Sequence, residues 1–178
     1  CPYDLIHVHE KSVEWERDKC NDCRACEAAM GSRGIIVQSV EKQKALDAAI
    51  ADACYATIKA VGKENCCFVN LAIDITPKCD CVNYSDTPLV PNLGVFASYD
   101  PVAIDKACLD KTVEAEGIQG SIADEKHVLA SGTHKLEACS PTLAGMTEDL
   151  QVNAGEINGM GTRNYQLIKV PDKEAGSF

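Results

Sequence analysis

Positive charge is scarce in this chain. Seventeen Lys and Arg residues face 27 Asp and Glu residues, so the formal net charge is −10. A nucleic-acid-binding protein needs a basic stripe to neutralise phosphates, and no such stripe is present. An anionic membrane surface would repel the chain for the same reason. The acidic balance predicts no nucleic-acid partner and favours docking to a basic protein by electrostatic steering.

Long apolar runs are also missing. No run approaches the roughly 20 residues of a membrane helix, and no charged and apolar leader precedes the first motif. No Ser/His/Asp or Cys/His pairing of the kind used in nucleophilic catalysis is evident. Hydrophobic residues nevertheless make up 46% of the 178 residues. This is ordinary for a globular protein, so we expect a folded chain with no membrane span.

Cysteine is abundant, with 11 residues, an odd number. A disulfide-stapled secreted domain is normally shorter and more densely supplied with cysteine. Here the cysteines fall into a triplet and pairs, which favours metal binding in a reducing compartment. The sequence therefore predicts a cytoplasmic location.

The triplet is Cys20, Cys23 and Cys26, with two residues between neighbouring sulfurs. Such spacing lets a tight loop point three thiolates at one spot, and C-x2-C-x2-C is the core of the bacterial ferredoxin run. A zinc knuckle usually has one pair at this spacing and a second pair further along. We expect a [4Fe-4S] cluster, with zinc or three unliganded thiols as the alternatives.

The sequence leaves two candidates for the fourth cluster ligand. The ferredoxin run places a fourth cysteine where this chain has Met30, whose neutral thioether is a poor iron ligand. Cys1-Pro2 lies nineteen residues before Cys20 and matches the end of an earlier run. In this interpretation Cys1 completes the cluster, and an amino-terminal segment of the same protein is missing. The alternative ligands are Cys79 and Cys81, which follow a predicted strand at the edge where α/β sheets often carry their sites.

Periodicity predicts the elements. Leu5–Val8 and Val13–Trp15 are expected to form a hairpin, and residues 34–37 another short strand. Residues 41–62 are expected to form a helix that ends at Gly62, with an apolar stripe of the following residues: Leu46, Ile50, Ala53, Cys54, Ile58 and Val61. Residues 66–75 are nearly all apolar, which is typical of a central strand covered on both faces.

Further along, residues 94–98 are predicted to form a buried strand. Asp100-Pro101 opens a helix well, because Asp is a good N-cap and Pro suits the first turn. Residues 118–142 are predicted to be irregular, Met146 to Ile157 helical, and Tyr165–Val170 a last strand. The predicted class is α/β, a mixed sheet with packed helices, preceded by a small ferredoxin-like cysteine-loop segment.

Several weaker candidates compete with ordinary structural roles. His7 and His9 share one strand face and are either ligands or solvated residues. Asp74, Asp80 and Asp86 could form a carboxylate site. Cys66 and Cys67 are interpreted as strand packing and Cys54 as a small core residue. A zinc site is also considered from three dispersed residues: His127, His134 and Cys139.

The segment VNLAIDITPKCDCVNYSDTPLVPNLGVFASYDPVAIDKACLD, residues 69–110, resembles domain-of-unknown-function family 362, described as uncharacterised iron–sulfur centre proteins. The resemblance runs from Cys20 to NGMGTRNYQLIKV near the end. It implies an iron–sulfur cofactor, an α/β fold and a longer amino end, and it carries no established reaction. Met30 and the absent upstream run depart from the family pattern.

We expect residues 1–38 to be a ferredoxin-like iron–sulfur segment and residues 39–178 an α/β domain. The leading hypothesis is an electron-transfer protein that serves a redox partner protein. The ligands are then Cys20, Cys23 and Cys26, with Cys1 or one of Cys79 and Cys81. The alternatives are an enzyme whose open-site cluster acts on a small substrate and a cluster that is purely structural. Whether the chain is an enzyme is left open.

Overall fold

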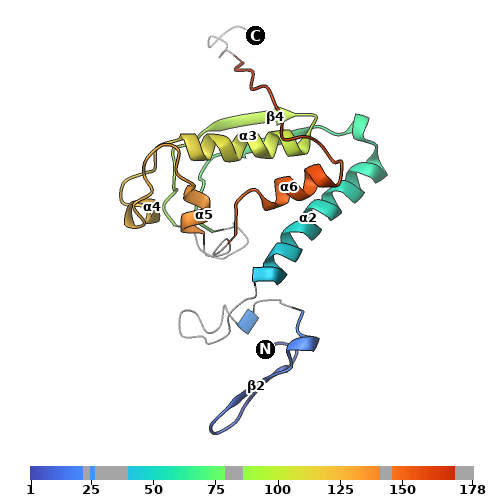
Figure 1. The fold of residues 1–178 in the computed structure, drawn as a ribbon, viewed down its shortest axis with the longest axis vertical. Helices are drawn as coiled ribbons and strands as arrows, with labels where there is room; N and C mark the ends of the chain where they lie inside the picture. The colour runs from blue at the N-terminus through green and yellow to red at the C-terminus, as the bar shows by residue number, and fades with distance from the viewer. Residues whose placement is uncertain (22–24, 27–39, 79–85, 141–145, 171–178) are drawn as a thin grey trace. The chain divides into compact units, whose positions relative to one another are not determined.

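A computed structural model describes residues 1–21, 25–26, 40–78, 86–140 and 146–170 (Figure 1). The chain divides into two compact units, Cys1–Ser39 and Val40–Phe178. Each unit is described by itself below.

The first unit contains a β-hairpin followed by one short helical turn. Strands β1 (Ile6–Val8) and β2 (Val13–Trp15) pair antiparallel, with His7 opposite Glu14. The 3-10 helix η1 (Arg17–Lys19) follows at once, and the Arg17 guanidinium lies 4.4 Å from the centre of the Trp15 ring. The predicted hairpin is confirmed. None of the described residues of this unit is buried.

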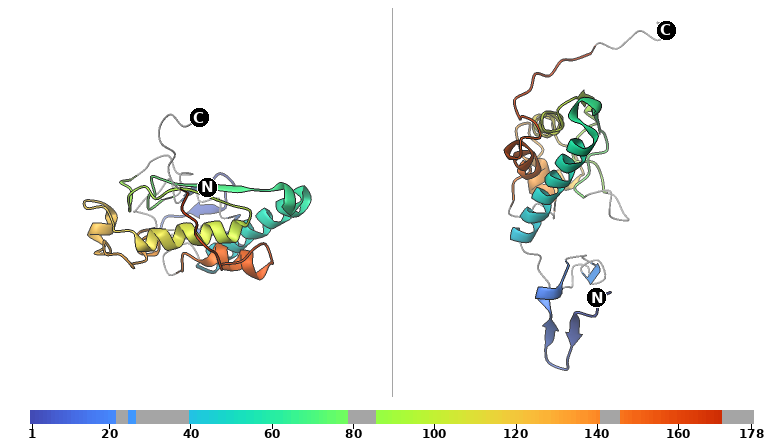
Figure 2. Two further views of the ribbon diagram at one scale, coloured as in Figure 1. Left: turned by 90° about the horizontal axis from the view of Figure 1, so that it is seen from above. Right: turned by 90° about the vertical axis from the view of Figure 1, so that its right-hand side faces the viewer.

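Helix α2 (Val40–Val61) opens the second unit and ends where the sequence predicts. Gly62 has φ of 92°, a backbone conformation that favours glycine and stops the helix. The predicted apolar stripe is only half right. Ile58 is buried and Cys54 packs beside it, but Leu46 and Ile50 are 49% and 47% exposed. The buried face is rotated toward Asp47 and Ala51, because it packs along helix α6 (Leu150–Ile157) (Figures 1 and 2).

After the 3-10 helix η3 (Lys63–Asn65), the strands β3 (Phe68–Ala72) and β4 (Gly94–Ser98) pair antiparallel. The prediction of a buried central strand over residues 66–75 is wrong for the described residues. The strand is shorter, alternate residues are exposed, and helix α3 (Pro101–Glu114) covers one face of this sheet. The continuous apolar run therefore marks two apolar faces, of which the described chain buries one.

Asp100 caps helix α3 as predicted. Its Oδ1 accepts hydrogen bonds from the backbone N–H groups of Val102 (2.9 Å) and Ala103 (3.0 Å), and Pro101 fills the first turn. Its Oδ2 accepts a bond from Thr162 N (3.0 Å). A side chain at Gly161 would collide with this carboxylate, so the close approach requires glycine. Asp100 thus joins the start of α3 to the Asn158–Thr162 turn.

The rest of the second unit is mostly short helices. Two of them, α4 (Ile122–Glu125) and α5 (Lys135–Cys139), occupy a region predicted to be irregular. Ser121 caps α4 and is a helix signal that the sequence analysis did not use. Helix α6 is shorter than predicted, and Met146 lies buried ahead of it. The predicted strand at Tyr165–Val170 is wrong, since the segment has no ladder partner among the described residues.

Two groups of buried side chains form the core of the second unit. One group lies between α2, α3 and α6 and consists of Ile58, Val102, Val152 and Met160. The other lies near α4 and α5 and consists of Leu89, Val90, Ala123 and Cys139. Lys135 is fully buried beside them, and its ammonium group donates to three backbone carbonyls, of which Ala130 O is at 3.0 Å. The described chain combines helices with two small antiparallel sheets, and α3 packs on the β3–β4 sheet, so the predicted α/β class is confirmed.

None of the helices in the described ranges is both long enough and apolar enough to cross a membrane.

Candidate functional site

The hairpin of the first unit directly precedes the cysteine run in the chain. Glu16 N donates to Leu5 O (3.0 Å) and closes the hairpin, and Cys20 N donates to Arg17 O (3.0 Å) at the end of η1. Cys20 is half-buried, and Cys26 is half-buried in a helical turn with Ala25. The order hairpin, turn, thiol is what the sequence predicts for a cluster loop.

Glu16 ties the hairpin to the turn before Cys20. Its carboxylate contacts His7 Nε2 at 3.1 Å and accepts a hydrogen bond from the Lys19 ammonium group. The bond from Lys19, followed by that from His7, lowers the pKa of Glu16, and the bond to Glu16 raises the pKa of His7. His7 is therefore engaged with a carboxylate. His9 lies 3.6 Å from Glu14 in a second exposed pair.

The other predicted ligands are placed as follows. Cys1 is exposed, and its carbonyl accepts a bond from Asp4 N (3.2 Å). Cys23, Met30, Cys79 and Cys81 lie outside the described residues. The predicted strand at residues 34–37 lies outside them too. Within the described ranges no three His, Cys, Asp or Glu side chains are gathered as a metal site, so Cys1, Cys20 and Cys26 do not form one by themselves.

The described thiols of the first unit have the chemistry that an iron–sulfur cluster requires. The thiols of Cys1, Cys20 and Cys26 are accessible or half-buried, and no disulfide consumes them. Thiolates are the ligands that iron–sulfur clusters take, and three of them on one short loop supply most of a cuboidal cluster's ligands. The run fits such a cluster, with Cys23 as its third thiolate and with Cys1, or one of Cys79 and Cys81, as the fourth.

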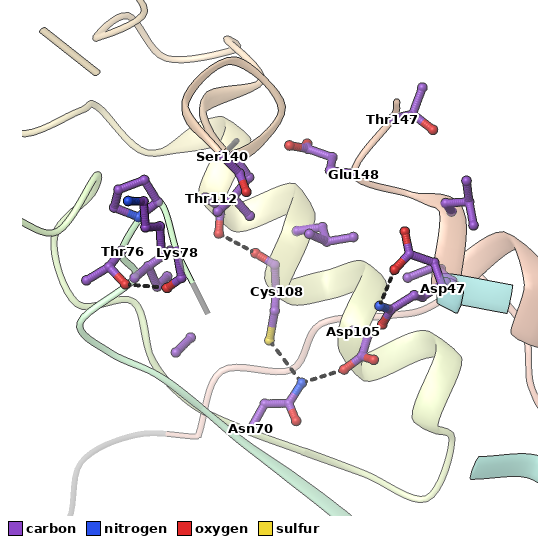
Figure 3. Close-up of a pocket in the computed structure, with 18 of the residues that line it drawn as sticks. Asp47, Asn70, Thr76, Lys78, Asp105, Cys108, Thr112, Ser140, Thr147 and Glu148 are labelled. Carbon is purple, nitrogen blue, oxygen red and sulfur yellow. Dashed lines mark hydrogen bonds between the residues drawn. The ribbon is translucent and has the colours of Figure 1, made fainter. Parts of the chain in front are cut away.

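A pocket of about 750 Å³ lies in the second unit (Figure 3). Four consecutive residues of β3, Val69 to Ala72, line it. Because successive side chains of a strand point to opposite faces, a wall of four consecutive residues is the edge of the strand. The facing walls come from α2, α3 and α6, and residues 75–78 form one end. The carbonyl of Lys78, at that end, accepts a hydrogen bond from Thr76 Oγ1 (2.9 Å).

Carboxylates dominate the charge of this pocket. Asp47 is 6% exposed and accepts from Gln43 Nε2 (3.3 Å) and Gln151 Nε2 (3.4 Å). The Glu148 side chain is 5% exposed and contacts His134 Nδ1 at 2.9 Å. Among the described lining residues, Asp105 is the third carboxylate and Lys78 is the one cationic side chain. Sequence analysis missed Asp47, although a lone Asp one residue beside an apolar stripe is a signal for such a position.

Asn70 links β3 to α3 at the pocket. Its Nδ2 donates to Asp105 Oδ1 (2.7 Å) and contacts Cys108 Sγ (3.6 Å). Burial raises the pKa of the Cys108 thiol, and it raises the pKa of Cys54 and Cys139 as well. Thiols with raised pKa stay protonated and are poor ligands and nucleophiles. The interpretation of Cys54 as a small core residue is confirmed.

The remaining candidate residues are engaged in packing or in hydrogen bonds, or are exposed. Cys66 packs against the first core group, whereas Cys67 is exposed, so packing holds for one of the two. The zinc site from His127, His134 and Cys139 is wrong, since His134 pairs with Glu148 and Cys139 is buried in the second core group. In the predicted carboxylate site, Asp80 lies outside the described residues. The backbone N–H of Asp74 donates a hydrogen bond to Asn92 Oδ1 (2.9 Å).

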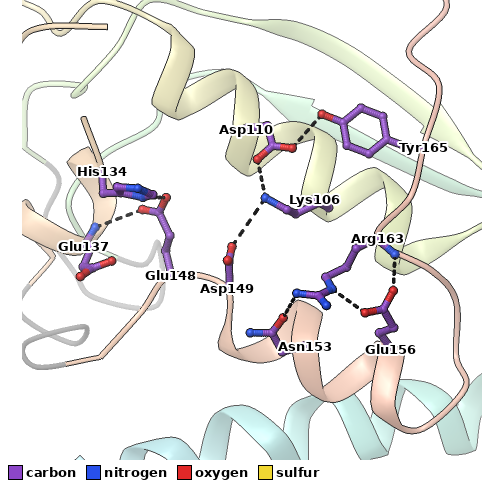
Figure 4. A network of polar contacts seen from close by, with 10 residues as sticks. All are labelled: Lys106, Asp110, His134, Glu137, Glu148, Asp149, Asn153, Glu156, Arg163 and Tyr165. Carbon is purple, nitrogen blue, oxygen red and sulfur yellow. Dashed lines mark hydrogen bonds and ion pairs between the residues drawn. The ribbon is translucent and has the colours of Figure 1, made fainter. Parts of the chain in front are cut away.

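A network of ion pairs lies on the other side of α3 (Figure 4). The Lys106 ammonium group lies between Asp110 and Asp149, and the bond to Asp110 raises the pKa of Lys106. Tyr165 donates its hydroxyl hydrogen to Asp110 (2.9 Å), and burial followed by this bond raises the pKa of Tyr165 to about 12. Arg163 pairs with Glu156 on α6. These contacts fix residues 163–165 against α3 and α6.

Comparison with known proteins gives one family. No curated protein and no solved structure gives a significant match. Residues 6–110, more than half of the chain, match the family described as domain of unknown function, DUF362. That range includes the cysteine run, the Cys79/Cys81 pair and the capped start of α3, the stretches that carry the resemblance in the sequence. The chain therefore belongs to the DUF362 family.

Proposed function

We propose that this protein carries one [4Fe-4S] cluster and transfers electrons to or from a redox partner protein. The observation that carries the proposal is the run Cys20, Cys23, Cys26, which follows a hairpin and a 3-10 turn in a unit without a buried residue in its described part. When bound, such a cluster takes up or releases one electron at a time. The run fits the cluster better than a zinc site, because no second pair at zinc spacing lies in the same unit.

The protein's own residues would hold and orient the thiolates. The contacts of Glu16 with His7 and Lys19 fix the chain that enters Cys20. Hydrogen bonds and exposure around the sulfurs set the potential of an iron–sulfur site. The half-buried Cys20 and Cys26 leave the site near the surface of its unit, as transfer to a partner requires.

Cys1 is the fourth ligand that we favour. It belongs to the same unit as the run, its spacing and Pro2 match the ferredoxin pattern, and Met30 then needs no other explanation. Cys79 or Cys81 would instead join the cluster to the second unit. The pair directly follows Lys78, which lines the pocket.

The partner would be a basic protein in a reducing, cytoplasmic compartment. With a net charge of −10, the chain attracts a basic surface, and this attraction weakens as salt screens it. The rate of electron transfer to such a partner should fall as ionic strength rises.

A second candidate function is supported by the pocket. About 750 Å³ with buried Asp47 and Glu148 is large enough for a small polar substrate, so an enzyme with an open-site cluster is the competing role. A purely structural cluster is the third role. Reversible one-electron reduction distinguishes the first proposal from the third.

Iron and acid-labile sulfide analysis of anaerobically prepared protein, with EPR of the reduced sample, tests the proposal. We expect about four irons and four sulfides per chain and the signal of a reduced [4Fe-4S] cluster. Stoichiometric zinc without sulfide would contradict it. A cluster that cannot be reduced reversibly would contradict electron transfer and would favour a purely structural role.

Variants of single cysteines test the fourth ligand. Cys1→Ser should destroy or convert the cluster, whereas Cys79→Ser and Cys81→Ser should leave its spectrum nearly intact. Cys67→Ser is the matched control, because Cys67 is exposed like Cys1 and lies outside both motifs. The reverse pattern would assign the fourth ligand to the Cys79/Cys81 pair.

A further inference from the structure

One face of the β3–β4 sheet is apolar and open to solvent. Val69 lies opposite Ala97 and Leu71 lies opposite Val95, and α3 covers the other face. Val69, Leu71 and Val95 are 56%, 63% and 65% exposed. A two-stranded sheet is marginal by itself and usually gains further strands. In the described part of the chain, no third strand joins this pair.

The same unit contains a segment that suits a strand and has no partner. Residues 166–170, the sequence QLIKV, make no hydrogen bond to any residue in the described ranges. Leu, Ile and Val are at home in a pleated, half-buried strand. Figures 1 and 2 show the segment leading away from the helices of its own unit.

The exposure of the apolar side chains rises along this segment. Tyr165 and Leu167 are 36% and 48% exposed, whereas Ile168 and Val170 are 75% and 79% exposed. Residues 168 and 170 would share one face of a strand. That face is apolar and matches the apolar face formed by Leu71 and Val95.

The start of the segment is fixed, which limits where the rest can go. Thr162 N is bonded to Asp100 and the Tyr165 hydroxyl group to Asp110, so the chain is held to α3 up to residue 165. Beyond that point it has no contact of this kind within the described ranges. Within the described ranges, the sheet has two strands and residues 166–170 have no strand partner.

We propose that residues 166–170 of one copy add as a strand to a free edge of the β3–β4 sheet of a second copy, and that the exchange is reciprocal. Each copy gives one strand and receives one, so the assembly closes as a two-fold dimer. Main-chain hydrogen bonds supply the pairing, as in other cases of strand addition. Ile168 and Val170 then extend the apolar face formed by Leu71 and Val95, as neighbours of the strand with which they pair.

The mass of the full chain in solution, measured by analytical ultracentrifugation over a concentration series, tests the proposal. We expect a monomer–dimer equilibrium that is lost when the chain is truncated after Asn164. Ile168→Lys and Leu71→Lys should each raise the dimer dissociation constant about tenfold or more. Ile157→Lys and Leu46→Lys are the matched controls, because these residues are 84% and 49% exposed and lie outside the proposed interface.

Amide hydrogen exchange adds a readout that truncation cannot give. Residues 166–170 should exchange more slowly at concentrations where the dimer forms than at high dilution. A monomer at every concentration would overturn the proposal, whether its tail is unprotected or paired within its own chain. A dimer that survives truncation, or that Leu46→Lys weakens as much as Leu71→Lys, would overturn it too.

Discussion

In Cys1–Ser39 no described residue is buried, whereas Val40–Phe178 contains two groups of buried apolar side chains. The contacts in the described part of the first unit are a three-residue ladder, a cation–π contact and exposed ion pairs. Exposed ion pairs contribute little to stability, because solvent screens them. The second unit has the apolar burial that stabilises a domain.

The difference indicates two sources of stability in one chain. A segment of about 40 residues usually needs disulfides, a metal or a partner to fold, and the described cysteines of the first unit form no disulfide. Metal binding to thiolates provides folding free energy directly. Our central claim, which rests on the proposed cluster, is that iron and sulfide hold the first unit and that side-chain packing holds the second.

The largest effect should come from the core of the second unit. Leu89 is fully buried, so Leu89→Ala should lower the free energy of unfolding of this unit by about 2–5 kcal/mol, through lost burial and the cavity left behind. Urea unfolding followed by circular dichroism measures it.

The control for this change is Leu46→Ala, at a half-exposed position of α2, which should shift stability by about 0.5 kcal/mol or less. The ultraviolet–visible spectrum of the cluster should not change in either variant. A loss of the cluster in Leu89→Ala would contradict the independence of the two units.

An intermediate effect is expected at Asp100. Asp100→Ala removes the cap of α3 and the acceptor for Thr162 N, and should cost about 0.5–2 kcal/mol in the same unfolding experiment. Asp100→Asn keeps one acceptor oxygen and should cost less. If both variants lose the same free energy of unfolding, helix capping is not the source of the stability that Asp100 provides.

The smallest effect is a pH dependence at His134. The contact with Glu148 raises the pKa of His134 above its ordinary value of 6.5. The pair is charged below that value, and its contribution is lost as pH rises through the raised pKa. His134 is 63% exposed, so the contribution should be below about 1 kcal/mol.

Urea unfolding at about pH 6 and pH 8 measures this contribution. Stability should fall slightly with rising pH in the natural protein and not in His134→Ala, and an NMR titration should show the raised pKa. A titration of His134 below pH 6.5 would refute the pairing.

The sequence predicted the local features well. The hairpin, the end of α2 at Gly62 and the cap of α3 at Asp100 depend on nearby residues, and all three are confirmed. The cysteine run could be recognised for the same reason, since its chemistry follows from spacing along a short loop.

Features that depend on distant contacts could not be predicted. The buried face of α2 is set by its packing on α6, so Leu46 and Ile50 are exposed although their spacing suits a core. QLIKV has the composition of a strand, but a strand forms only where an edge is within reach. The pocket joins residues of β3 to residues of α6, which no local pattern brings together.

Amide hydrogen exchange of the same protein with and without iron tests the central claim most directly. Removing iron and sulfide under anaerobic conditions should make the amides of Ile6–Val8 and Val13–Trp15 exchange rapidly, while those of β3, β4 and α3 keep their rates. Cys20→Ser should reproduce this pattern without chelator. A hairpin that stays protected without iron, or a second unit that loosens together with the first, would contradict the account.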